Sequence, residues 1–123
     1  MILGTKSRYA VMAMVELAGK PPETPVRLSE LAEAQEITVP YLEQIFSKLK
    51  QAGLVKSVRG PGGGYVLARP AQDTRVGEIV AAVEENTKMT RCEKHMVGGC
   101  MAKGTRCLTH DLWDGLEAHI THY

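Results

Sequence analysis

The sequence predicts a mainly α-helical fold with one small β-hairpin. Apolar residues recur at helical spacing through most of the chain, whereas two short β-type runs flank a glycine-rich turn at residues 60–64. With 123 residues, 44% of them hydrophobic and 24% charged, the chain has the composition of a soluble domain with a modest core. No apolar run approaches the roughly 18 residues of a membrane helix. The N-terminus carries no secretory signal, so we expect a cytoplasmic protein with no membrane partner.

The N-terminal third predicts a helix, a polar loop, a short extended piece and a second, shorter helix. In that order they occupy residues 5–18, 20–25, 26–28 and 30–35. Thr5 is the expected N-cap of the first helix, and Gly19 stands where that helix should end. Leu31 is expected to point into the core from the shorter helix.

A third helix is predicted over residues 39–53, with Thr38 as its N-cap and Gly53 as its C-cap. Pro40 falls in the first turn, where a missing N–H costs nothing. Apolar residues at i, i+3, i+4 and i+7 form the core stripe of this helix: Leu42, Ile45, Phe46 and Leu49. About three residues separate it from the helix before it, which is the spacing of a helix-turn-helix.

A β-hairpin is predicted directly after this helix. Its strands are expected at residues 54–58 and 65–68, and the glycines between them permit the positive φ angles of a tight turn. Another helix follows over residues 76–85, with a core face made of Ile79, Val80 and Val83. A reading helix followed by such a hairpin is a winged helix-turn-helix.

The C-terminal part predicts a long loop and a last helix. Residues 87–106 show no periodicity, and a loop of this length in a compact domain is usually functional or disordered. From Cys107 onward the pattern is helical again, with an apolar stripe made of Leu108, Leu112, Trp113, Leu116 and Ile120. No stop signal precedes Tyr123, so we expect the native helix to be longer than the segment seen here.

Positive charge is concentrated on the predicted reading helix and hairpin. Residues 41–69 hold five lysines and arginines against Glu43, a local balance of +4, so the whole-chain charge of +1 leaves −3 for the rest. The helix face opposite the core stripe presents Pro40, Glu43, Gln44, Ser47 and Lys48, with Tyr41 at its edge. For any single helix, such a face is more often ordinary solvated surface than a binding site, but a basic wing directly after it favours nucleic acid.

These residue types suit contacts with double-stranded DNA. Gln44 can pair with adenine in the major groove, and Glu43 can accept a hydrogen bond from cytosine. Ser47 and Lys48 can hold phosphates, which sets the register without reading sequence. Arg59 begins the glycine-rich turn, where a narrow wing can bring it to the negative potential of the minor groove.

A cysteine–histidine cluster stands near the C-terminus. Intervals of seven, six and two residues separate Cys92, Cys100, Cys107 and His110. An odd number of cysteines in a chain of cytosolic character argues against a disulfide framework. Three thiolates and an imidazole can hold either iron–sulfur or zinc, with His95 as a competing ligand, and the absence of paired C-x2-C knuckles favours iron–sulfur. Three unrelated reduced cysteines are the competing interpretation.

Several segments carry a resemblance to a known family. They read KSRYAVMAM at 6–14, YLEQIFS at 41–47, VRGPGGGY at 58–65 and CLTHDLW at 107–113, with TRC at 90–92. Through them the chain resembles, over essentially its whole length, the IscR-type iron–sulfur cluster regulators within a wider family of bacterial winged-helix sensors. The resemblance implies homodimers that join through a long C-terminal helix. It also implies that the state of the cluster determines which promoters are bound, and that the regulated genes include those of cluster assembly.

The resemblance also implies particular site residues. It assigns a [2Fe–2S] cluster to Cys92, Cys100, Cys107 and His110. It places Glu43, Gln44 and Arg59 among the DNA contacts, with Tyr41 and Ser47 nearby. The expected organisation is therefore a DNA-binding domain over residues 1–86, a cluster-binding loop over 87–106 and a dimerisation helix over 107–123.

Three alternative functions remain open at the level of sequence. The intervals between the cysteines are longer than those of the IscR branch, so a nitric-oxide- or iron-responsive regulator with a [4Fe–4S] cluster is one alternative. A small iron–sulfur redox protein would bind no specific DNA sequence, and a DNA-binding protein with structural zinc would be colourless. No serine–histidine–acid grouping or pair of catalytic carboxylates indicates an enzyme with a small-molecule substrate.

Overall fold

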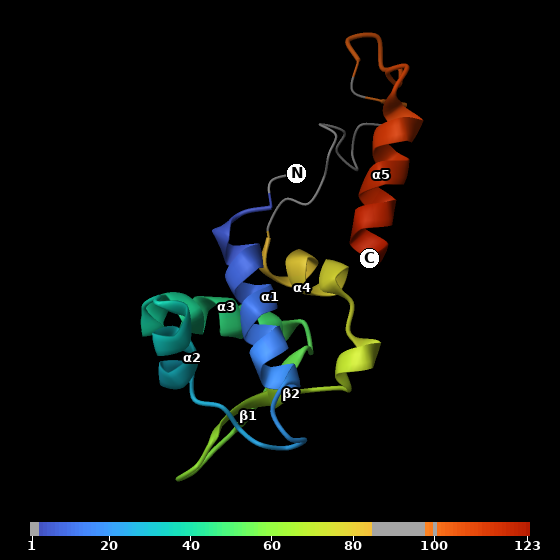
Figure 1. Cartoon of the computed structure of the whole chain (residues 1–123). Coiled ribbons are helices and arrows are strands. Elements are labelled where there is room, and N and C mark those ends of the chain that lie inside the picture. Colours follow the sequence, from blue (N-terminus) through green and yellow to red (C-terminus); the bar gives the residue numbers. More distant parts are fainter. Residues whose placement is uncertain (1–2, 85–97, 100) are drawn as a thin grey trace.

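The computed structural model describes residues 3–84, 98–99 and 101–123. Its elements are α1 (Thr5–Ala18), α2 (Leu28–Gln35), α3 (Val39–Gln51), β1 (Val55–Val58), β2 (Gly64–Leu67), the 3-10 turn η1 (Ala71–Asp73), α4 (Val76–Val83) and α5 (His110–His122). Figure 1 shows α1 through the middle of the molecule, the hairpin at one end of α1, and α5 standing out beyond α4. A mainly helical fold with a two-stranded hairpin confirms the predicted class.

The core lies around α1. This helix packs against α2, α3, α4 and β2, and it does so through small residues, since Ala10 and Ala13 are fully buried. Leu31 of α2 is also fully buried, as its position in the pattern predicted. Within the described part of the chain, no helix is both long enough and apolar enough to cross a membrane.

Helix α3 is held in place by its apolar stripe. All four predicted core residues are buried to 1% exposure or less: Leu42, Ile45, Phe46 and Leu49. Burying side chains of this size stabilises the fold by roughly 1.5–3 kcal/mol each. The Thr38 hydroxyl accepts a hydrogen bond from the Tyr41 N–H at 3.4 Å, which confirms the predicted N-cap, and Pro40 lies in the first turn. One face of α3 is therefore fixed inside, and the opposite face is outside.

The hairpin is a two-stranded antiparallel sheet with an additional bridge. Val55 pairs with Leu67 and Val58 with Gly64, and the predicted extended piece joins at Val26. Val26 and Tyr65 exchange both backbone hydrogen bonds, at 3.0 and 2.9 Å. A Cβ at Gly64 would overlap the Val26 carbonyl, so this position requires glycine. The wing is thereby anchored to the segment that leads into α2.

Several predicted helix ends differ by one to three residues from those observed. Thr5 is the first residue of α1 rather than its cap; Gly4 is the N-cap and adopts an extended conformation. The second helix begins at Leu28, because the Arg27 carbonyl accepts the Leu31 N–H at 3.2 Å and starts the helix earlier. At the end of α3, Ala52 is the C-cap, and Gly53 follows with φ 74°.

The later helices also differ from the prediction at their ends. Helix α4 stops at Val83, because Glu84 is extended (φ −95°, ψ 133°). Its predicted core residues are buried: Ile79, Val80 and Val83. Helix α5 begins at His110, so Cys107 precedes the helix instead of starting it. Its predicted apolar stripe faces outward in the single chain, and Leu112, Trp113 and Leu116 are exposed.

Candidate nucleic-acid interface and metal centre

The outer face of α3 carries the predicted base-reading residues. Glu43, Gln44 and Ser47 are exposed, whereas Tyr41 is half-buried. The Tyr41 ring meets the Tyr9 ring of α1 edge to face, with centroids 6.0 Å apart and planes at 88°. Such pairs add roughly 0.5–1.5 kcal/mol beyond their buried area. The first turn of α3 is thus fixed against α1, which sets the direction in which Glu43 and Gln44 project.

A small hollow lies between this face of α3 and the neighbouring helices α1 and α4. It has a volume of about 20 Å³, room for about one water molecule, and is lined by Lys6, Tyr41, Gln44, Ile45, Lys48 and Val83. Lys6 from the start of α1 therefore lies beside the reading face, where the sequence alone left its role open. A cationic side chain at the edge of this face is placed where a phosphate contact is useful.

Lys48 differs from the other predicted contacts because it is half-buried and has a partner within the chain. Its Nζ donates a hydrogen bond to the backbone carbonyl of Val83 at 3.4 Å. Val83 is the last residue of α4, where the unpaired carbonyls and the negative end of the helix dipole favour a cation. Lys48 therefore connects the reading helix to α4.

The wing is narrow at its tip. Gly60 and Gly62 have φ angles of 107° and 98°, and the Gly63 N–H donates to the Gly60 carbonyl at 2.9 Å. A Cβ at Gly63 would collide with the Val58 carbonyl, so no side chain fills the turn. Arg59 stands exposed at this tip, and among the described residues it makes no hydrogen bond or ion pair.

Two contacts fix the wing relative to α3. The Phe46 and Tyr65 rings pack with centroids 4.8 Å apart, which joins the buried side of α3 to β2. Lys50 Nζ donates to Ser57 Oγ at 3.1 Å, which joins the end of α3 to β1. The helix and the wing therefore form one reading surface, joined through both strands of the hairpin. Neither contact could be found from sequence spacing, since the tyrosine and the serine belong to another element.

Two of the four predicted metal ligands, Cys107 and His110, lie in the turn that leads into α5. The His110 N–H donates to the Cys107 carbonyl at 3.1 Å, and both side chains are half-buried. The Thr109 hydroxyl lies 3.8 Å from Cys107 Sγ and accepts from Trp113 Nε1 at 3.0 Å. Cys92, Cys100 and His95 lie outside the described residues. Within the described ranges, no group of three or more histidines, cysteines and acidic residues could hold a metal ion.

A helical core, a reading helix with an exposed polar face and a basic wing joined to that helix define a winged helix-turn-helix regulator of transcription. The model of the Rrf2 family, described as an iron-dependent transcriptional regulator, matches residues 3–123. The chain belongs to this Rrf2 family, and within it the chain is of the IscR type.

Individual relatives support this assignment. The chain is 50% identical to the HTH-type transcriptional regulator IscR of Vibrio atlanticus (strain LGP32), over all of this chain and 69% of the relative. It is 47% identical to the protein of the same name from Escherichia coli O1:K1 / APEC, over all of this chain and 74% of that one. These names confirm a regulator in place of an enzyme.

Solved structures give the same fold. The global cysteine regulator CymR (YrzC) of B. subtilis matches with a TM-score of 0.74 and 33% identity, over 98% of this chain and 89% of that one. The T. potens IscR structure matches with a TM-score of 0.72 and 36% identity, over 99% of this chain and 78% of that one.

Proposed function

We propose that this regulator senses iron–sulfur status through a [2Fe–2S] cluster and controls genes of cluster assembly from an operator on double-stranded DNA in the cytoplasm. The observation that carries the proposal is the shared turn of Cys107 and His110 at the start of α5. That turn places Cys107 and His110 close together in the chain, at the start of the helix that also carries the exposed apolar stripe. The likeness to proteins named IscR supports the same assignment.

The proposed DNA contacts follow the reading surface. We assign groove contacts to Glu43, Gln44 and Arg59, which are all exposed. Tyr41, Ser47 and Lys48 lie beside these residues on α3, and we assign to them contacts with the backbone phosphates. The basic wing tip and the polar face of α3 belong to different elements that are joined by two contacts. One chain can therefore contact the major groove with α3 and the minor groove with the wing.

The donor set fits an iron–sulfur cluster. Thiolates and imidazole are ligands that iron accepts, and half-burial of Cys107 and His110 limits the access of water to the site. Cys92 and Cys100 would complete the set from the preceding loop. When bound, the cluster would supply a redox- and iron-sensitive group. Cys107 would link the cluster to α5 through Thr109, whose hydroxyl lies 3.8 Å from Cys107 Sγ and accepts from Trp113 Nε1.

The exposed stripe on α5 supports a homodimer. Leu112, Trp113 and Leu116 lie on α5 and are exposed in the single chain, and Leu108, just before the helix, is exposed as well. An apolar stripe of this kind is costly in water and is buried when two copies pair. Two DNA-reading surfaces joined through α5 would then bind two half-sites, whose separation is set by the dimer.

The proposal is tested by the colour of protein purified without oxygen. The wild type is expected to be brown, and Cys92→Ala, Cys107→Ala and His110→Ala are expected to lose or alter the visible absorbance. His119→Ala is the matched control, because it removes another histidine of α5 that is exposed. Unaltered absorbance in Cys92→Ala and Cys107→Ala would remove both from the ligand set.

The cysteine intervals favour a second candidate within the same family, a nitric-oxide- or iron-responsive regulator with a [4Fe–4S] cluster. The intervals of seven and six residues between Cys92, Cys100 and Cys107 are longer than those of the IscR branch, so a three-cysteine [4Fe–4S] arrangement is the alternative. Mössbauer spectroscopy of the same anaerobic protein distinguishes two-iron from four-iron clusters, and a colourless protein containing zinc would exclude both.

A further inference from the structure

The first turn of α4 is where the C-terminal helix meets the DNA-binding half of the chain. Gly77 is buried, and a Cβ there would overlap the Thr121 carbonyl, so the last turn of α5 sits directly on α4. Beside it, Arg75 Nη1 lies 3.1 Å from each ring nitrogen of His122. A guanidinium can only donate, so the imidazole nitrogen that bonds it must be unprotonated.

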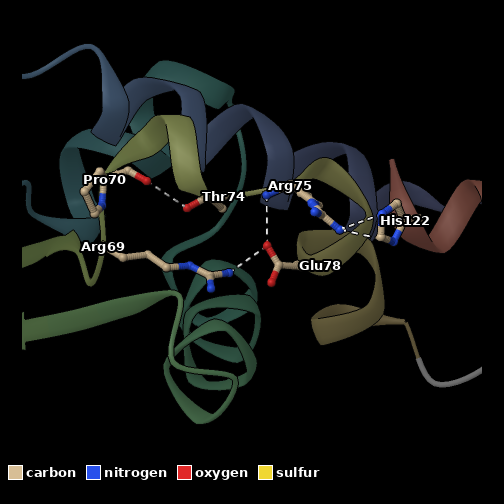
Figure 2. Close-up of polar contacts among 6 residues, drawn as sticks. All are labelled: Arg69, Pro70, Thr74, Arg75, Glu78 and His122. Atoms are coloured by element: carbon tan, nitrogen blue, oxygen red, sulfur yellow. Dashed lines mark hydrogen bonds and ion pairs between the residues drawn. The ribbon is translucent and has the colours of Figure 1, made fainter.

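Glu78 joins this contact to the base of the wing. Its Oε2 accepts the Arg75 N–H at 2.9 Å and pairs with Arg69 Nη2 at 2.7 Å. Arg69 comes two residues after the end of β2 at Leu67, so its position is tied to the hairpin. Figure 2 shows the resulting series of contacts, which runs from the Arg69 side chain through Glu78 to the Arg75 backbone, and from the Arg75 side chain to His122.

Glu78 determines the orientation of the Arg69 side chain. Within the described part of the chain, Arg69 Nε is buried and has no hydrogen-bond partner, so the ion pair with Glu78 is what directs the guanidinium. The hydrogen bond from Arg69, and then that from the Arg75 backbone, hold the pKa of Glu78 below its ordinary value, so its carboxylate is charged at neutral pH. The two side chains are 37% and 39% exposed. A pair this exposed adds little stability, and its effect is chiefly on geometry.

We propose that Glu78 is a positioning residue that transmits the seating of α5 on α4 to the base of the wing, an inference that rests on the proposed function. Helix α5 begins at His110, beside the candidate cluster ligand Cys107, and ends at His122 on α4. A helix of 13 residues spans roughly 20 Å as a rigid rod, so a change at its start moves its last turn. The Arg75–Glu78–Arg69 series carries that movement to β2, and two seatings of α5 give two wing positions.

The test uses Glu78→Gln in the full chain. Glutamine retains an acceptor for the Arg75 N–H, so the helix start is preserved, but it removes the charge that holds Arg69. Glu30→Gln is the matched control, because Glu30 also lies in the first turn of a helix and is exposed. The remote variant is His122→Ala, which removes the α5 end of the series.

The first readout is hydrogen exchange of backbone amides in residues 55–67, measured on cluster-free protein without DNA. Both Glu78→Gln and His122→Ala are expected to speed exchange in the wing, and Glu30→Gln to leave it unaltered. In a chain that already carries Glu78→Gln, His122→Ala should not speed exchange in the wing any further, because both substitutions interrupt the same series of contacts. Independent, additive effects would show a merely local role for Glu78 and overturn the inference.

The second readout is the ratio of operator Kd values with and without the cluster. Glu78→Gln is expected to reduce this ratio by about threefold or more, from a coupling of the usual size of 5- to 150-fold. If the operator Kd of the wild type depends on the cluster and the ratio of Kd values is as large in Glu78→Gln, the inference is overturned and the sensing proposal stands. If the operator Kd of the wild type is the same with and without the cluster, the sensing proposal is refuted. If the two variants still have non-additive effects on hydrogen exchange in the wing, the link from His122 through Glu78 to the wing stands.

Discussion

Arg59 at the wing tip provides a sharp test of DNA recognition, because removing it should affect binding and nothing else. The side chain is exposed, and within the described residues it makes no hydrogen bond or ion pair. Arg59→Ala should therefore leave the free energy of unfolding within about 0.5 kcal/mol of the wild type, as for other surface substitutions. Any loss of DNA affinity then comes from the contact itself.

The size of the expected loss follows from the kind of contact. A good groove contact of an arginine is worth about 1–3 kcal/mol, so Kd should rise roughly 5- to 150-fold. If Arg59 instead neutralises one phosphate, the slope of log K against log salt should also fall by about 0.9. Fluorescence anisotropy with an operator duplex at several salt concentrations measures both quantities.

The matched control is Arg27→Ala, which removes an exposed arginine from the N-cap position of α2. It lowers the net charge equally but lies away from the wing tip in sequence. If Arg59→Ala and Arg27→Ala weaken binding equally, the effect is one of general charge, and the reasoning about the wing is refuted.

The other predictions concern the reading helix, the core and pH. Gln44→Ala should broaden the selected-site motif more than it weakens total affinity, and an unaltered motif would count against α3 as the reader. Phe46→Ala should lower the free energy of unfolding by about 3–5 kcal/mol in urea titration, because this ring is fully buried between α3 and β2; a loss below about 1 kcal/mol would contradict that packing. Glu78 has a lowered pKa in the folded chain, so its contribution to stability is present above its unfolded pKa and is lost as pH falls through the folded one. The difference in Tm between wild type and Glu78→Gln should therefore shrink on acidification, and a difference that does not vary with pH would contradict the ion pair.

The fold was predictable where one segment determines its own structure. The stripe from Leu42 to Leu49 repeats at helical period, and Thr38 and Pro40 mark the start of that helix, so α3 and its outer face followed from local pattern. The glycines at the wing likewise indicated a tight turn, and Gly63 and Gly64 prove to be sites where a side chain would collide with backbone.

Contacts between distant segments were not predictable in the same way. The Glu78–Arg69 ion pair and the Arg75–His122 contact join residues up to 47 positions apart, and their spacing carries no periodic signal. The start of α1 was misplaced because Thr5 has the usual cap chemistry, whereas the backbone of Gly4 takes that position. The same holds for Lys48 in the candidate site. Its position in the sequence indicated an exposed phosphate contact, but its hydrogen bond to the distant Val83 carbonyl could not be predicted.

The central claim is that the cysteine–histidine site at the start of α5 controls DNA binding by the winged helices. The most direct measurement is the Kd of the wild-type protein for its operator, with the cluster present and after its removal by an iron chelator under anaerobic conditions. We expect the Kd to change by at least about fivefold, which is the lower end of ordinary coupling between two sites. Equal affinity in the two states, on every duplex that the protein selects, would contradict it.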